Sequence, residues 1–411
     1  MADKTIVVLA TLDTKGVEAQ YVKEKIEKLG AKTLIVDVGV VGEPAIKADV
    51  SREAVAEAGG TPLAKLLEDP DREVAAPIMA QGATNIITRL AEEGAVHGIM
   101  SMGGTQGTTL ATSVMRALPY GFPKVMVSTM ASSNVAPWVD IKDITMMFSV
   151  TDILGLNPVI RTILANAAGA TVGMTQATVP MESTEKPLVA VTTVGITTLG
   201  AMKAIEVLEA AGYETIVFHA VGTGGRAMEQ LMEEGVIGAV LDYSTIEVSN
   251  EMFDALLAGG KKRLTTAGDL GLPQVLSCGA IEVLVFNEPE TVPPPFDTRT
   301  LIRHSPMITD VRLNGEEMAR VGKEIAKRLQ HTTGEAVFII PTAGYDSYAV
   351  AGEGFYDPAA DQAFVDALKA NLPANIKVIE RDRHIDDPVF ATEAARLLIE
   401  LIEKKDQEQS P

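Results

Sequence analysis

Short runs of Val, Ile and other apolar residues alternate along the chain with longer segments whose apolar residues recur at helical spacing. This alternation is typical of a parallel sheet whose strands are joined by helices. The runs at 5–10 and 98–102 are clear examples of predicted strands, and a helical pattern follows each of them. The pattern therefore predicts an α/β protein built from strand–helix units.

The strand–helix pattern stops once and then begins again. Residues 181–186 are polar and charged, a proline follows them, and a new apolar run starts at once. Such a segment is typical of a linker between domains. We therefore expect an N-terminal domain over 1–180, a C-terminal domain over 187–405 and a frayed tail at 406–411.

The two halves resemble each other and predict a diverged duplication. Residues 30–36 resemble 212–218, and residues 90–94 resemble 231–235. The offset between matched segments falls from 182 to 141 residues, so the first half carries 41 more, which we place in the polar stretch at about 39–79. We expect two Rossmann-like domains with mainly parallel sheets and a cleft between them, with ligands beyond the carboxyl ends of the strands.

The segment from Gly103 to Thr109 is the most informative candidate site. It holds three glycines and three threonines in seven residues, after a predicted strand and before a predicted helix. Glycines let an anion approach the main chain, and backbone N–H groups converge at a helix N-terminus. The alternative is a tight strand–helix turn without a ligand, but this density of Gly and Thr favours a phosphate-binding loop.

Two other predicted turns carry small or hydroxyl-bearing residues, at 11–16 and 128–133. In the first, Asp13 could accept a hydrogen bond from a ribose hydroxyl group or hold a metal through water, and Lys15 could neutralise phosphate. The alternative is a capped helix start without a ligand. Neither a P-loop nor a dinucleotide-binding fingerprint is present. The predicted cofactor-binding residues are Thr11, Asp13, Thr14, Lys15, Gly103, Gly104, Thr105, Gly107, Thr108, Thr109, Ser128, Thr129 and Ser132.

The second half offers candidates for acid–base chemistry or metal binding. They are His219, Glu247, His304 and His384, each in a predicted turn or loop. Loop histidines are more often solvated surface residues than catalysts. No Cys/His cluster has zinc spacing, so no metal ligands are assigned, and Cys278 is expected to be a small buried residue rather than a nucleophile.

Charge and composition exclude several classes of function. The chain has 411 residues and a net charge of −20, which argues against a surface for nucleic acid or anionic lipid. One cysteine excludes an intrachain disulfide, and no signal peptide or membrane-spanning run is visible. We expect a soluble, cytoplasmic protein that forms homo-oligomers.

Taken in order, several motifs resemble the Tm-one-like ATP-binding family, named after a tomato protein that confers resistance to tomato mosaic virus. The matching segments are 101–109, 118–124, 128–132, 152–157, 218–228, 242–247 and 384–388. The resemblance implies two Rossmann-like subdomains with ATP in the first. It implies that residues 103–109 hold phosphates, helped by 11–15 and 128–132. Cys278 and Asp386 depart from the family pattern, where many members have Pro and Asn.

Three functions follow as hypotheses. The first is an enzyme that binds Mg-ATP, with Mg²⁺ bridging the phosphates, and acts on a small acidic metabolite; His219, Glu247, His304 and His384 would then be its catalytic candidates. The second is a nucleotide-responsive sensor without turnover. The third is an enzyme for phosphorylated metabolites that uses no ATP.

Overall fold

A computed structural model describes residues 4–68, 72–177 and 186–409. The chain divides into two compact units, residues 1–180 and 181–411. Apart from Lys186, the expected linker at 181–186 lies outside the described residues. Within the described ranges, no helix combines the length and the apolar character needed to cross a bilayer.

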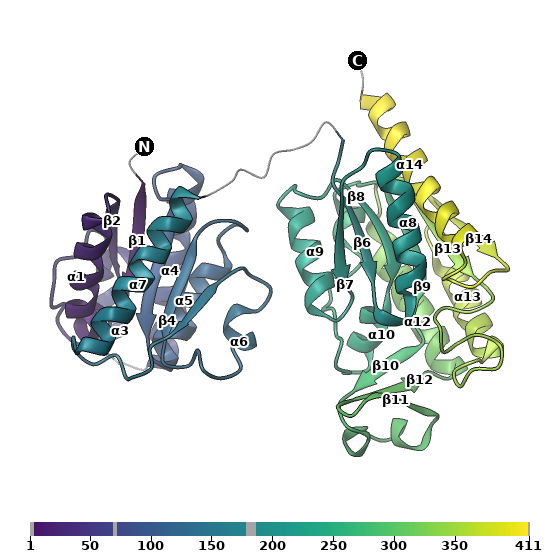
Figure 1. The fold of residues 1–411 in the computed structure, drawn as a ribbon, viewed down its shortest axis with the longest axis horizontal. Helices are drawn as coiled ribbons and strands as arrows, with labels where there is room; N and C mark the ends of the chain where they lie inside the picture. Colours follow the sequence, from purple (N-terminus) through teal and green to yellow (C-terminus); the bar gives the residue numbers. More distant parts are fainter. Residues whose placement is uncertain (1–3, 69–71, 178–185, 410–411) are drawn as a thin grey trace. The chain divides into compact units, whose positions relative to one another are not determined.

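The first unit is a parallel five-stranded sheet between two layers of helices (Figure 1). In spatial order its strands are β2 (Lys32–Asp37), β1 (Thr5–Ala10), β3 (Gly98–Gly103), β4 (Lys124–Ser128) and β5 (Thr145–Phe148). Helices α1 (Leu12–Lys28) and α7 (Pro158–Gln176) cover one face. The other face carries α2 (Arg52–Ala58), α3 (Leu63–Glu68), α4 (Arg72–Glu92) and α5 (Thr105–Arg116), and the short α6 (Ala136–Val139) packs near α5.

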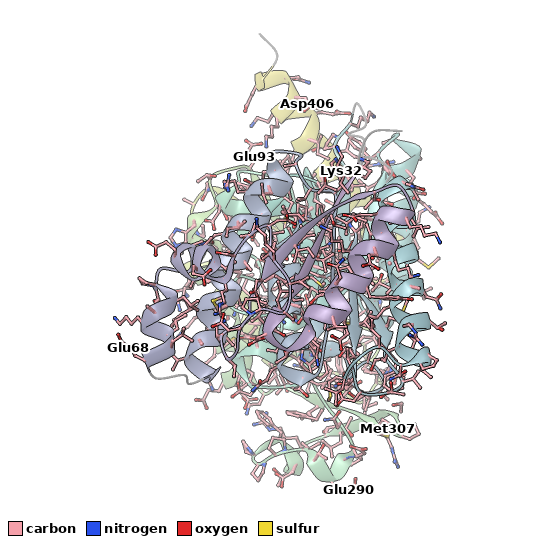
Figure 2. The ribbon with its side chains drawn as sticks, turned by 90° about the vertical axis from the view of Figure 1, so that its left-hand side faces the viewer. Lys32, Glu68, Glu93, Glu290, Met307 and Asp406 are labelled. Atoms are coloured by element: carbon pink, nitrogen blue, oxygen red, sulfur yellow. The ribbon has the colours of Figure 1, made fainter. Side chains whose placement is uncertain are left out.

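Burial on both faces explains why the central strands are mostly apolar, with no alternation of apolar and polar positions. All six residues of β3 are buried, and so are all five of β4. A strand covered on both sides has no solvent-facing positions, so it lacks the apolar–polar alternation of a half-exposed strand. The strands run between two ends of the unit. Lys32, at the start of β2, and Glu93, which follows α4, lie at one end in Figure 2, and the candidate site lies at the opposite, carboxyl ends of the strands.

The second unit repeats this architecture with one more strand and an added ribbon (Figure 1). Its sheet order is β14 (Ile376–Arg381), β13 (Ala336–Pro341), β9 (Gln274–Gly279), β8 (Ala239–Ser244), β6 (Val189–Thr193) and β7 (Thr215–His219), all parallel. The antiparallel ribbon is β10 (Val283–Phe286), β12 (Ile308–Arg312) and β11 (Leu301–Ser305). Met307, between β11 and β12, and Glu290 lie at the ribbon end in Figure 2.

Helices cover both faces of the second sheet as well. Helices α8 (Thr198–Ala210) and α14 (Pro388–Gln409) pack together in one core cluster. Helices α12 (Gly315–Arg328) and α13 (Pro358–Asn371) pack together in another. The remaining helices are α9 (Thr223–Glu233), α10 (Ile246–Met252), α11 (Thr266–Asp269) and the short 3-10 turns η1 (Gly195–Thr197), η2 (Pro289–Thr291), η3 (Phe296–Thr298) and η4 (Leu329–His331).

The strand order agrees with the predicted duplication. The first four strands of each unit, β1 to β4 and β6 to β9, take the same places in their sheets. Three helices, α2 to α4, lie between β2 and β3, whereas α9 alone lies between β7 and β8. The stretch at 39–79, which the sequence presents as polar and weakly periodic, is therefore substantially helical. Likewise α14 continues to Gln409, so most of the expected frayed tail at 406–411 is helix.

Two helix-interior glycines give a test of this packing. An ideal Cβ on Gly82, in α4, would lie 1.8 Å from the backbone oxygen of Val55 in α2, whereas one on Gly169, in α7, would meet nothing within 4 Å. We expect Gly82→Ala to lower the free energy of unfolding of the first unit by about 2–3 kcal/mol through overpacking. Gly169→Ala should raise it by up to about 1 kcal/mol, because alanine favours helix.

Urea denaturation followed by circular dichroism measures both changes, with the transition of the first unit as the readout. Equal effects of the two substitutions would contradict the close contact between α2 and α4.

Candidate functional site

A cavity of about 340 Å³ opens at the carboxyl edge of the first sheet. Its polar half is formed by eight of the predicted cofactor-binding residues: Thr11, Asp13, Thr14, Lys15, Gly103, Gly104, Thr105 and Gly107, joined by Gln106. Its other half is apolar: Val38, Val40, Val41, Ala76, Met79, Met102 and Leu110. Two of the three turns singled out by the sequence thus meet at one cavity.

The glycine-rich loop brings the start of α5 against the end of β3. An ideal Cβ on Gly103 would lie 3.0 Å from the Cα of Gly107, so only glycine allows this approach without a shift. Gly104 is the N-cap of α5 and makes no side-chain cap. A Cβ there would meet only the hydroxyl of Thr129, at 3.8 Å, so its open side is accessible. A helix N-terminus without a side-chain cap attracts anions through its N–H groups and dipole.

The turn after β1 contributes two hydroxyls. The Oγ1 atoms of Thr11 and Thr14 lie 2.8 Å apart and are exposed enough to reorient toward a ligand. The first N–H of α1, on Leu12, donates to Oδ1 of Asp37 at 3.0 Å. This helix N-terminus is therefore partly satisfied by the protein itself, whereas that of α5 receives no cap from its own N-cap residue.

Asp13 shapes the cavity wall instead of presenting a free carboxylate. Its Oδ2 accepts hydrogen bonds from the N–H groups of Val41 (2.9 Å) and Gly42 (3.0 Å), which fixes the loop after β2. Its Oδ1 is shielded from solvent and has no hydrogen-bond partner among the described residues. Burial raises the pKa of the neighbouring Asp37, and the charge of Asp13 raises it further.

The remaining predicted residues do not line the cavity, and all of them except Ser132 support the loop. The hydroxyls of Thr108 and Ser128, both fully buried, are 2.7 Å apart and tie α5 to β4. Thr109 donates to the backbone oxygen of Thr105 (3.0 Å) and accepts from the indole of Trp138 (3.0 Å). Thr129 donates its N–H to the backbone oxygen of Gly103 (3.3 Å), and Ser132 is exposed.

The apolar half of the cavity was not predicted from the sequence. Val38 and Val41 follow β2, and Ala76 and Met79 lie on α4, within the predicted insert. The signal was the insert itself, because additional chain at the carboxyl edge of a parallel sheet commonly builds a ligand wall.

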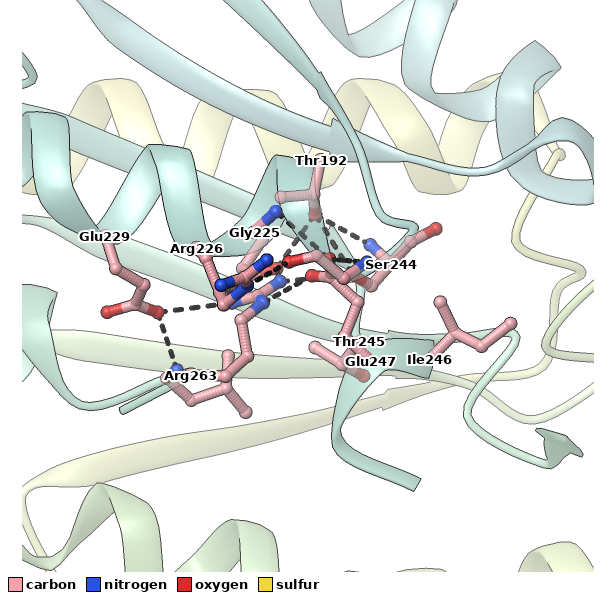
Figure 3. Close-up of polar contacts among 12 residues, drawn as sticks. Thr192, Gly225, Arg226, Glu229, Ser244, Thr245, Ile246, Glu247 and Arg263 are labelled. Atoms are coloured by element: carbon pink, nitrogen blue, oxygen red, sulfur yellow. Dashed lines mark hydrogen bonds and ion pairs between the residues drawn. The ribbon is translucent and has the colours of Figure 1, made fainter. Parts of the chain in front are cut away.

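In the second unit, Glu247 is structural, which corrects its expected place in an acid–base pocket. Its side chain is fully buried, and its Oε1 accepts the N–H groups of Gly222 (2.6 Å) and Gly225 (3.0 Å) at the start of α9 (Figure 3). Its Oε2 pairs with Nε of Arg263 at 2.6 Å. Glu247 therefore occupies a helix N-terminus that would otherwise be open to a ligand anion.

Arg263 gathers three carboxylates in this buried network (Figure 3). Its guanidinium bonds both oxygens of Asp242, at 2.5 and 2.6 Å, and Glu229 lies 3.5 Å away. Burial opposes the charge of Arg263, but the carboxylates, Asp242 first, hold its pKa well above the ordinary value. Burial raises the pKa of Glu229. The carboxylates of Asp242 and Glu247 are thus both engaged in buried structural contacts.

The three predicted histidines are not gathered into one site. His219 is exposed at the end of β7. Nδ1 of His304 lies 3.0 Å from the hydroxyl of Tyr348, and Nε2 of His384 donates to the backbone oxygen of Asp346 at 2.8 Å. His304 and His384 therefore both contact one loop, residues 342–357. Among the described residues, no group of three or more His, Cys, Asp or Glu side chains could hold a metal ion.

Two carboxyl groups meet in the interior of the second unit beneath that loop. Glu282 and Asp346 are both 0 % exposed, and both oxygens of Glu282 and Oδ2 of Asp346 lack an ordinary hydrogen-bond donor among the described residues. Burial is the main cause that raises both pKa values, and the charge of Asp346 raises that of Glu282 further. The two groups lie close enough to influence each other's pKa, so a proton held by one of them would join one oxygen of Glu282 to Oδ2 of Asp346 and reduce their repulsion. Cys278 is also fully buried, and burial raises the pKa of its thiol.

Family comparison identifies the chain. Residues 4–180 match the model described as the Uncharacterised protein family (UPF0261) N-terminal domain, and residues 186–402 match that of the C-terminal domain. The chain belongs to the UPF0261 family. A UPF0261 protein of Clostridium tetani is 41 % identical over 403 residues, 98 % of this chain and 100 % of the relative. Another from Rhizobium meliloti is 41 % identical over 394 residues, 95 % and 97 % of the two chains.

A tomato relative confirms the resemblance found in the sequence. The ToMV resistance protein Tm-1(GCR237) of Solanum lycopersicum is 33 % identical over 344 residues, which cover 81 % of this UPF0261 chain and 45 % of the tomato protein. Among solved structures, the UDP-N-acetylglucosamine 2-epimerase of Rickettsia bellii covers 98 % of both chains at a TM-score of 0.22 and 9 % identity. That likeness carries no inference about function.

The shared proton predicts how stability depends on pH. A carboxyl whose pKa is higher in the folded than in the unfolded state stabilises the fold at low pH, and this contribution is lost as pH rises. As the pH rises from about 4, loss of the proton from this pair should therefore progressively lower the free energy of unfolding of the second unit. Glu282→Gln, whose amide can donate to Asp346 permanently, should raise the free energy of unfolding at pH 8 by about 1–2 kcal/mol and flatten this decline.

Urea titrations between pH 5 and 8 measure the effect, and the matched control is Glu353→Gln, at an exposed carboxyl of the same loop. A variant at Glu282 that is destabilised at every pH, or that keeps the wild-type pH slope, would contradict the shared proton.

Proposed function

We propose that this UPF0261 protein binds Mg-ATP in the cavity of its first unit. The observation that carries the proposal is the pairing, in one cavity, of a glycine-flanked helix N-terminus with an apolar wall. A nucleotide needs both features, since its phosphates are anionic and its base is flat and largely apolar on its faces. The family resemblance to ATP-binding proteins supports the same ligand.

The arrangement of the cavity suggests how the nucleotide lies. The start of α5 at Gly104 and the hydroxyls of Thr11 and Thr14 would take the phosphates. The base would lie against Val41 and Met79. Mg²⁺ would supply charge neutralisation, and because it is commonly held by phosphates and water, it requires no cage of protein ligands.

The second unit supports a stoichiometry of one nucleotide per chain. Ile246 starts α10, at the topological position that Thr105 has in α5, and is buried. It packs in an apolar cluster with Ala349 and Phe355 of the 342–357 loop. Ile196, in the turn after β6, packs against the same cluster. Side chains of the protein thus fill the region equivalent to the nucleotide cavity.

Gly104→Val tests the phosphate site. The backbone at Gly104 (φ −79°, ψ −162°) suits any residue, and a Cβ at this position has room, so the fold should be kept. The branched side chain would cover the N–H groups of α5. We expect the Kd for Mg-ATP, measured by calorimetry, to rise at least about tenfold with little change in Tm. Gly169→Ala serves as the control, and unchanged affinity in Gly104→Val would contradict the assignment.

A ligand series separates nucleotide binding from binding of phosphorylated metabolites. If the apolar wall receives the base, Mg-ATP should bind more tightly than inorganic tripolyphosphate or ribose 5-phosphate by about tenfold or more. Calorimetry should give one site per chain. Equal affinity for all three ligands would favour an enzyme that uses no ATP. In a separate assay, release of ADP when Mg-ATP is incubated with carboxylic acids would show an enzyme and not a sensor.

A further inference from the structure

Lys15 links the cavity to a neighbouring loop. Lys15 is the single basic residue among those that line the cavity. Its ammonium donates to the backbone oxygen of Ile153, at 2.5 Å, and pairs with no carboxylate in the part of the chain that the structure describes. Its backbone (φ −125°, ψ 16°) departs from helical values inside α1. The cavity and the loop at 149–157 thus share one side chain, on an irregular turn.

The loop at 149–157 is held under strain. Val150 has φ 62°, a left-handed conformation that is unfavourable for a β-branched residue and persists only where the surroundings impose it. A second tie holds the same loop, because the buried carboxylate of Glu18 accepts the N–H of Gly155 at 2.8 Å. Both ties come from the first turns of α1.

The same loop carries exposed apolar side chains. Leu154 is 78 % exposed and Val150 is 61 % exposed, although Ile153 between them is fully buried in the core. Ile153 therefore anchors the loop, and a change in the contact of its carbonyl group would reorient the peptides on either side of it. Such a change would alter an apolar part of the surface.

We propose that Lys15 is a nucleotide-operated latch, which holds the 149–157 loop in the empty protein and releases it when polyphosphate enters the cavity. This inference rests on the proposed function, since it assumes that the cavity receives a nucleotide. The ammonium has two alternative partners: the neutral carbonyl group of Ile153 and an anionic phosphate.

Electrostatics favours phosphate as the partner when it is present. An ion pair between ammonium and phosphate is stronger than a hydrogen bond from ammonium to a neutral carbonyl group. The four-carbon stem of lysine lets the charge move without the helix moving. Once the carbonyl group of Ile153 is released, the left-handed strain at Val150 can relax, which adds to the preference for the released state.

Hydrogen exchange with and without saturating Mg-ATP tests the latch in the full chain. In the wild type, nucleotide should increase exchange several-fold in the peptide that covers 149–157. Lys15→Met, which keeps most of the stem and removes the charge, should show the faster exchange already without nucleotide and respond little to it. The matched control, Lys23→Met, lies further along α1 in a partly exposed ion pair with Glu27 and should behave as the wild type.

Binding is measured in parallel by calorimetry, so that the two proposals fail separately. If the wild type binds Mg-ATP but exchange at 149–157 does not change or decreases, the latch is overturned and the binding site stands. If the wild type binds no nucleotide, the proposed function falls and the nucleotide-operated latch with it. If nucleotide-free Lys15→Met exchanges at the wild-type rate, Lys15 does not hold the loop.

Discussion

The close approach of α5 to the end of β3 is the contact on which the candidate site depends. It exists because Gly103 has no Cβ, and one there would lie 3.0 Å from the Cα of Gly107. The approach places the first turn of α5 at the mouth of the cavity, and the buried hydroxyl pair of Thr108 and Ser128 fixes it there. The other walls of the cavity are built around this turn.

The two units show how one topology can serve different purposes. In the second unit, internal carboxylates reach the helix starts: Glu247 accepts N–H groups at α9, and Asp386 accepts the N–H of Gly200 in α8 at 2.8 Å. A carboxylate of the protein there plays the part that a ligand anion would play. In the first unit, the start of α5 has no such side-chain cap from its own N-cap residue, and it faces a cavity. The additional helices α2 to α4 complete the contrast, since α4 supplies part of the apolar wall.

Buried charge has a different role in each part of the second unit. Arg263 neutralises part of a cluster of three carboxylates and so makes their burial tolerable. Glu282 and Asp346 form no ion pair with a cation among the described residues, and burial raises the pKa of both, which favours a proton on the pair. The proton that this second pair holds links the stability of the 342–357 loop to pH.

The sequence by itself determined the α/β class, the repeated strand–helix units, the family and the turns that supply the polar half of the cavity. These follow from local patterns, because periodicity and glycine-rich turns are encoded by neighbouring residues. Only the tertiary structure decided the partners of each charged group. Glu247 has the residue type of an acid–base catalyst, but Arg263 and the start of α9 bind it in the core. The apolar wall at Met79 likewise arises when α4 packs beside the loop after β2. Such long-range contacts depend on how distant segments fold together, which no local pattern specifies.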